Sequence, residues 1–95
     1  MSRTEKAVAY VDGLSEKELK TLWGYLRHGS DRSGPVEIRE LQLPRQMLET
    51  LACYAINRGC VSSAPEEQGK EAYREACAIH LGHFRALGRS LKEDS

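Results

Sequence analysis

The sequence predicts a small, mainly α-helical domain built from four helices, and three observations lead to that prediction. Apolar residues recur at helical spacing in several segments, and proline or glycine stands near the ends of those segments. No segment alternates apolar and polar residues cleanly over its whole length, as a half-buried strand would. With 95 residues the chain has the size of one domain, so we expect residues 1–95 to form a single helical unit.

The amino-terminal third predicts two helices. The first is short, covers about residues 3–11 and is closed by Asp12-Gly13. The second begins at Ser15, because Glu18 three residues later completes a capping box. A cation followed by a glycine, His28-Gly29, suits the carboxyl end of that helix. One face of the second helix is apolar, through Leu19, Leu22, Trp23 and Leu26.

The next stretch is the least regular part of the chain. Residues 29–35, GSDRSGP, are rich in turn formers, and we expect a mobile loop there. Residues 36–43, VEIRELQL, are ambiguous, because alternation divides their apolar side chains between two faces. A short strand and a helical turn therefore both stay open for this segment. The side chains concerned are Val36 and Ile38 on one face and Leu41 and Leu43 on the other.

The carboxyl-terminal half predicts two further helices. Pro44 favours a first helical turn, and Arg58-Gly59 is expected to end the third helix, followed by a loop over residues 60–64. Pro65 opens the last helix. The face of the third helix comprises Met47, Leu48, Leu51, Tyr54 and Ala55. We expect a core made of Leu19, Leu22, Trp23, Leu26, Leu48, Leu51, Ile79 and Phe84.

The last helix carries a regular seam, which we define as Tyr73, Cys77, His80, Phe84, Leu87 and Leu91. Its members return at alternating steps of four and three residues. This spacing keeps all of them on one narrow side of a helix, which is typical of a helix that packs along another helix. The seam therefore predicts either packing within the chain or a homodimer interface.

A basic ridge on the same helix is the candidate surface for a protein partner. Arg74, Arg85 and Lys92 fall within about 20° of one another on a helical projection, with Arg89 close by. Such a ridge would suit an acidic surface of a protein partner, while a solvated face with charges matched to the helix dipole is the simpler interpretation.

Composition limits the classes of function. The 14 basic and 14 acidic residues cancel, and this disfavours a dedicated nucleic-acid binder, which usually carries a basic excess. Three cysteines are an odd count, so reduced thiols are expected. No apolar run approaches the roughly 20 residues that span a bilayer, and the amino terminus lacks the apolar core of a signal peptide. We therefore expect a cytoplasmic protein that does not enter a membrane.

Cysteines and histidines are the residues of this chain that could bind a metal or act as nucleophile and base. Cys77 and His80 lie on neighbouring turns, but His83 is about 120° from Cys77 around the helix. Six residues separate Cys53 from Cys60, so this pair lacks the short spacing of a metal knuckle. We expect Cys53 and Cys77 to be small buried hydrophobic side chains. No catalytic residues, metal ligands or cofactor are predicted, and the chain is not expected to be an enzyme.

The small size of the chain, and the absence of motifs for catalysis or metal binding in the sequence, favour a small regulator or inhibitor that acts by stoichiometric binding to a protein partner. Such a partner would be, for example, a transcription factor or a defence complex. A resemblance supplies the alternative: residues 41–49, LQLPRQMLE, followed by Leu51, Ala55 and Gly59, resemble the strand and first helix of ribbon-helix-helix repressors. The resemblance implies a dimeric, DNA-binding transcriptional repressor, in which Ile38, Glu40 and Gln42 would face the DNA.

Overall fold

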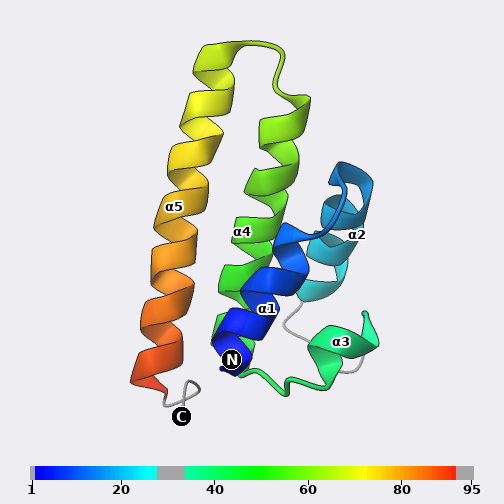
Figure 1. Cartoon of the computed structure of the whole chain (residues 1–95), viewed down its shortest axis with the longest axis vertical. Helices are drawn as coiled ribbons and strands as arrows, with labels where there is room; N and C mark the ends of the chain where they lie inside the picture. The colour runs from blue at the N-terminus through cyan, green and yellow to red at the C-terminus, as the bar shows by residue number, and fades with distance from the viewer. Residues whose placement is uncertain (1, 28–33, 92–95) are drawn as a thin grey trace.

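A computed structural model describes residues 2–27 and 34–91, and these residues form an all-α fold without strands (Figure 1). The elements are α1 (Arg3–Asp12), α2 (Glu16–Leu26), α3 (Val36–Arg39), α4 (Arg45–Ser63) and α5 (Glu67–Ser90). The two long helices, α4 and α5, run antiparallel as a hairpin, and α4 lies between α5 and α2 (Figure 1). The predicted helical class is confirmed, with five helices in the described part of the chain where the sequence predicts four.

The centre of the core is α4. Its buried side chains face α2 on one side and α5 on the other. In contrast, α5 contributes one fully buried large side chain, Phe84. The fully or nearly fully buried apolar residues are Ala7, Val8, Val11, Leu19, Leu22, Leu26, Ile38, Leu43, Met47, Leu48, Leu51, Ala52, Tyr54, Ala55 and Phe84. The core therefore depends on α4 being covered from both sides.

The start of α2 is as the sequence predicts. The backbone N–H of Glu18 donates to Ser15 Oγ at 3.3 Å, and the backbone N–H of Ser15 donates to Glu18 Oε1 at 3.0 Å. These two bonds satisfy backbone donors that the first turn of a helix leaves free. The helix ends at Leu26. Its predicted stop at residues 28–29, and residues 29–33 of the predicted mobile loop, lie outside the described residues.

Of the two alternatives for residues 36–43, the short strand is wrong and the helical turn is confirmed. Val36–Arg39 form α3, followed by a turn in which Gln42 has a φ of 51°. The backbone N–H groups of Ile38 and Arg39 both donate to the carbonyl of Pro35 at 3.1 Å. A lone strand here would have no neighbour for its backbone, whereas a helical turn satisfies these groups locally. Ile38 and Leu43 both reach the core from the two ends of this segment.

The predicted end of the third helix is also wrong, because α4 continues past Arg58-Gly59 to Ser63. Residues 60–63 of the predicted loop are therefore helical. Gly59 is buried, and a Cβ placed on it would lie 3.7 Å from Leu19 Cβ and 3.9 Å from the carbonyl oxygen of Glu16. The glycine thus allows α2 to cross α4 closely and does not terminate the helix.

Two residues expected in the interior lie on the surface. Ile79 is 67% exposed, and Cys53 is also exposed. Trp23 is half-buried at the edge of the core, where the guanidinium of Arg27 lies 4.9 Å from the centre of its ring. For Ile79 the reason is geometric: α5 is covered by α4 and α1 on one side only, so an apolar residue on its other side stays in solvent.

Thr4 supports a prediction on stability. Its side chain is fully buried in α1, and its hydroxyl has no hydrogen-bond partner within residues 2–27 and 34–91. An unpaired buried hydroxyl costs free energy, while valine has nearly the same shape without the polar atom. We expect Thr4→Val to raise the free energy of unfolding by about 1 kcal/mol, measured by urea denaturation. Thr4→Ala should lower it, since it leaves a cavity; a loss of stability in Thr4→Val would contradict the interpretation.

Candidate functional site

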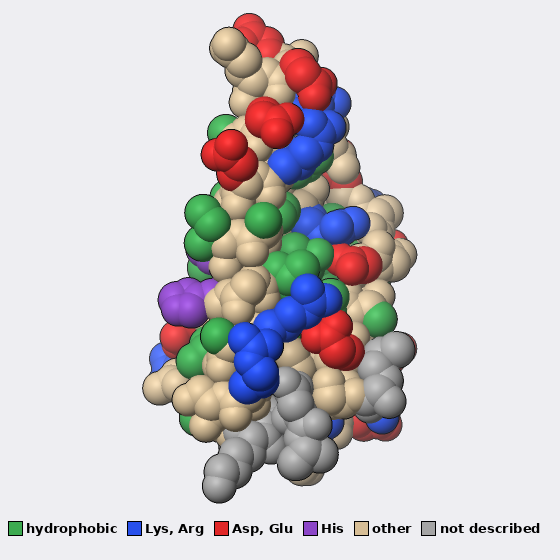
Figure 2. Space-filling model, turned by 60° about the vertical axis from the view of Figure 1, so that its left-hand side comes forward, with side chains coloured by type: hydrophobic (Ala, Val, Ile, Leu, Met, Phe, Trp, Pro, Cys, Tyr) green, Lys and Arg blue, Asp and Glu red, His purple; other side chains and the backbone are tan. Residues whose placement is uncertain are grey.

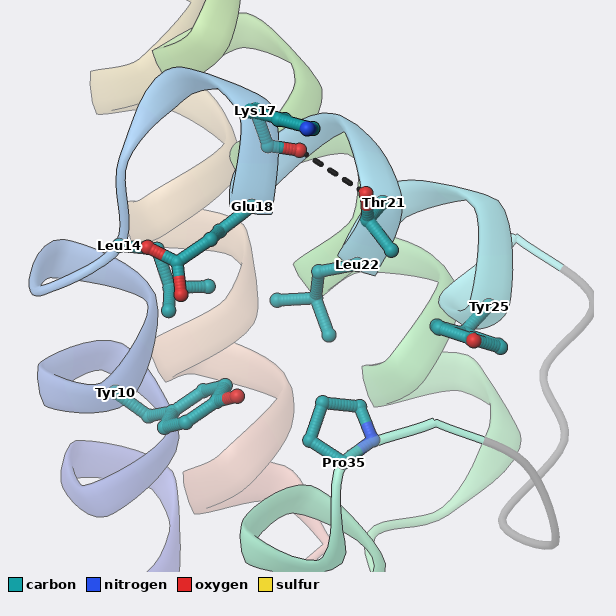
Figure 3. A pocket seen from close by; sticks show the side chains of 8 residues that line it. All are labelled: Tyr10, Leu14, Lys17, Glu18, Thr21, Leu22, Tyr25 and Pro35. Carbon is teal, nitrogen blue, oxygen red and sulfur yellow. Dashed lines mark hydrogen bonds between the residues drawn. The ribbon is translucent and has the colours of Figure 1, made fainter.

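A mainly apolar hollow lies between α1, α2 and Pro35 (Figure 3). We call it the tyrosine pocket, and its lining residues are Tyr10, Leu14, Lys17, Glu18, Thr21, Leu22, Tyr25 and Pro35. Its volume is about 240 Å³ and it opens to solvent. Small-molecule sites usually enclose about 300–1,000 Å³. The tyrosine pocket is smaller than that range, and its volume suits a single inserted side chain.

Local interactions place each wall of the tyrosine pocket. The link between α1 and α2 is tight: the backbone N–H of Leu14 donates to the carbonyl of Val11 at 3.1 Å, which holds Leu14 above Tyr10. On α2, the hydroxyl of Thr21 donates to the carbonyl of Lys17 at 3.1 Å (Figure 3). This bond satisfies the hydroxyl within the helix, so the methyl group of Thr21 is the part left for a ligand.

Tyr25 forms the far wall, and a glycine permits its position. Gly34 has a φ of 97°, a conformation that side chains rarely adopt, and a Cβ on it would lie 3.3 Å from Tyr25 Cβ. The chain thus comes back close against Tyr25 and carries Pro35 beneath the pocket (Figure 3). Tyr25 remains 42% exposed, so its ring is available to a partner.

The tyrosine pocket has an acidic side. Partial burial raises the pKa of the Tyr10 hydroxyl, and the carboxylates of Glu37 and Glu18 raise it further. The Tyr10 hydroxyl points into the space between Leu22 and Pro35 (Figure 3) and keeps its proton at neutral pH. The pocket therefore offers apolar walls and two phenolic hydroxyls, with Glu18 and Lys17 in its lining. Glu37 lies close enough to act on Tyr10 as well, so two carboxylates favour a positive charge beside that hydroxyl.

A second polar cluster joins α1 to α4. The hydroxyl of Tyr54 donates to Asp12 Oδ1 at 2.5 Å, and Arg58 Nη1 lies 3.3 Å from the same carboxylate oxygen. Burial raises the pKa of Tyr54 to about 12, with the bond to Asp12 as the next cause. The guanidinium of Arg58 also lies 5.8 Å from the centre of the Tyr54 ring. We assign this cluster to holding α1 on α4, since its phenol is buried.

The basic ridge is largely engaged with carboxylates of the same chain. Arg74 Nη1 donates to Glu67 at 2.8 Å and to Glu71 at 3.3 Å, and Arg85 makes a two-pronged pair with Glu5 of α1 at 2.8 and 2.9 Å. Blue and red side chains accordingly lie in pairs in Figure 2. Arg89 is exposed, and Lys92 lies outside the described residues. The ridge therefore presents less free positive charge than its sequence suggests.

The seam on α5 faces the rest of the chain along its middle. Phe84 is fully buried, Cys77, His80 and Leu87 are half-buried, and Tyr73 and Leu91 are more exposed. Of the two alternatives, packing within the chain thus accounts for the central members. Burial raises the pKa of the Cys77 thiol, so the thiol stays protonated at neutral pH and is a poor nucleophile. His83 lies on the exposed side of α5.

The residues named for the DNA-binding alternative do not form a reading surface. Ile38 is 4% exposed, and Glu40 and Gln42 lie in the turn after α3. A ribbon-helix-helix protein needs a strand from each subunit, and α3 stands where that strand would be.

Within the described ranges, no three His, Cys, Asp or Glu side chains come together as a candidate metal site. No described helix has the length and apolar character to cross a membrane. Comparison with protein-family models, curated proteins and solved structures found no match.

Sequence reasoning placed Tyr10 in the first helix but assigned neither tyrosine to a site. One signal was available for Tyr25: it follows Leu22 by three residues, so it had to lie on the flank of the apolar face of α2. The position of Pro35 in the same pocket could not be read from the sequence, because it depends on the tertiary structure.

Proposed function

We propose that this protein is a non-catalytic regulator that binds a protein partner in a one-to-one complex through the tyrosine pocket. The observation that carries the proposal is the pocket itself: an apolar, open hollow for one side chain, with Tyr25 exposed at its edge. Tyrosines at the edge of an apolar pocket are frequent anchors of protein interfaces, because they combine a large apolar ring with a polar tip.

The chemistry of the pocket specifies the partner further. Leu14, Leu22 and Pro35 would surround an apolar side chain of the partner, and burying it removes apolar surface from water. Glu18 and Glu37 act together on the Tyr10 hydroxyl, so they would also attract a cation beside that anchor. We therefore expect a partner segment in which an apolar residue stands next to lysine or arginine. A cytoplasmic partner, such as a transcription factor or a defence complex, remains part of the proposal.

The test uses two surface substitutions matched for exposure. Tyr25 and Val36 are 42% and 46% exposed, but only Tyr25 lines the tyrosine pocket. With tagged full-length protein as bait in nuclease-treated native lysate, we expect one partner to be retained by the wild type and by Val36→Asp. Tyr25→Asp should retain at least about tenfold less, as loss of an interface anchor does. Circular dichroism would confirm that both variants are folded.

Titration of the purified partner then decides the proposal. A stoichiometry of one to one and a dissociation constant that rises with Tyr25→Asp alone would support it. Equal binding by the two variants would remove the tyrosine pocket from the interface. A partner that is captured from untreated lysate but not from nuclease-treated lysate would point to a nucleic acid instead and overturn the proposal.

A further inference from the structure

The side of α5 that faces away from α4 carries an unusual set of exposed residues. We call it the outer face, and its central members are Ala78, Ile79, Gly82, His83 and Ala86, all exposed. Between Glu75 and Arg89 the helix has one Asp, Glu, Lys or Arg residue, Arg85, and that side chain is paired with Glu5 of α1. In Figure 2 acidic side chains gather at the upper end of the molecule, where α5 begins. The middle of the outer face thus carries no Asp, Glu, Lys or Arg side chain and is exposed to solvent.

Nothing within the described chain accounts for the small residues of this face. A Cβ on Gly82 would have no atom within 4 Å, although glycine inside a helix costs about 1 kcal/mol relative to alanine. Ala78 and Ala86 lie one turn before and one turn after Gly82 on the same line of the helix. Beside this line stands Ile79, 67% exposed. A row of small residues leaves a shallow groove on the helix, and a groove beside a projecting apolar side chain suits the close approach of another helix.

The charges at the two ends of the outer face indicate which helix would pack against it. Glu75 lies seven residues before Gly82 and Arg89 seven residues after it, about 10 Å away in each direction. Both side chains are exposed, and neither makes an ion pair with another residue among 2–27 and 34–91. A second α5 that crosses antiparallel at Gly82 would therefore bring Arg89 opposite Glu75 twice, once at each end.

We infer that two copies of this chain form a dimer through the outer faces of α5, related by a two-fold axis at Gly82. In this arrangement Ala78 of each copy faces Ala86 of the other, and Ile79 packs beside the same alanine. The interface is self-complementary, as a two-fold contact must be. A parallel pairing would instead oppose Glu75 to Glu75 and Arg89 to Arg89, which is repulsive. The outer face is separate from the tyrosine pocket, so this inference does not depend on the proposed partner.

Charge reversal tests the arrangement on the full-length protein. Wild type should sediment as a dimer that dissociates on dilution. Glu75→Arg and Arg89→Glu should each raise the dimer dissociation constant at least about tenfold, because each places like charges opposite one another at both ends. The double variant should recover the wild-type dimer. Mixing the two single variants in equal amounts should also form dimers, since both end contacts are then of opposite charge.

Two further variants separate this interface from other surfaces. Ile79→Glu should abolish the dimer, whereas Tyr25→Asp on the opposite side of the fold should leave it unchanged. Monomeric wild type at about 100 μM, well above the dissociation constants of stable dimers, would overturn the inference. So would a dimer that persists in both single reversals, or single variants that fail to associate when mixed. Circular dichroism of each variant shows that lost association is not lost folding.

Discussion

Replacement of Phe84 by alanine should lower the free energy of unfolding by about 3–4 kcal/mol. Phe84 is fully buried and is the main apolar anchor of α5 in the core. Its loss removes apolar contacts and leaves a cavity between α4 and α5 that the long helices cannot readily close. For a domain of 95 residues this is a large part of the usual total stability of about 5–15 kcal/mol. Urea denaturation followed by the fluorescence of Trp23, the chain's single tryptophan, measures the change.

The matched control is Ile79→Ala on the same helix. Ile79 is 67% exposed, so its truncation should change the free energy of unfolding by no more than about 0.5 kcal/mol. The comparison should be made at a protein concentration where the chain is monomeric, because Ile79 lies in the inferred dimer interface. Equal losses in the two variants would mean that α5 is rotated relative to the orientation described above.

Stability should fall as the pH rises from about 10 to about 12, with Tyr54 as the cause. The ordinary tyrosine pKa of 10.0 applies to the unfolded chain, and burial together with the bond to Asp12 raises the folded value to about 12. The folded state therefore holds this proton more tightly. Its stabilising contribution is complete below pH 10 and disappears as the pH passes the folded pKa, a loss of about 2–3 kcal/mol.

Tyr54→Phe separates this effect from other alkaline titrations. At pH 8 the variant should be less stable than the wild type by about 1–3 kcal/mol, because the hydrogen bond to a carboxylate is lost. Between pH 10 and 12 the gap should close, since only the wild type has a buried phenol to ionise at this position. Thermal or urea unfolding of both proteins across this range measures the gap, and a constant difference would show that folding does not raise the pKa of Tyr54.

The outcome for residues 36–43 shows where local pattern was insufficient. Their apolar side chains fit neither period, because Ile38 and Leu43 reach the core from a short helix and a turn with a left-handed residue at Gln42. Gly59 shows the same limit in a different way. A glycine after arginine is a good helix stop locally, yet α2 packs against it and α4 continues to Ser63.

The candidate site was less predictable than the fold. The tyrosine pocket joins Tyr10 of α1, Tyr25 of α2 and Pro35, which come from separate parts of the chain and meet only in the tertiary structure. The basic ridge was visible in the sequence, and so were Glu67 and Glu71 near Arg74 on the same helix, but the acid that pairs with Arg85 was not. Glu5 lies 80 positions from Arg85 along the chain and is paired with it by the packing of α1 against α5.

The sequence by itself determined the helical class, the start of α2 at the Ser15–Glu18 capping box, and the inward position of Phe84 on α5. These depend on spacing and capping within a few residues, which the chain carries wherever it folds. Only the tertiary structure decided that Ile79 lies in solvent, that Gly59 is a crossing point and that Arg85 is paired. Each of these depends on which neighbour covers a helix and from which side, and a helical pattern does not encode its neighbour.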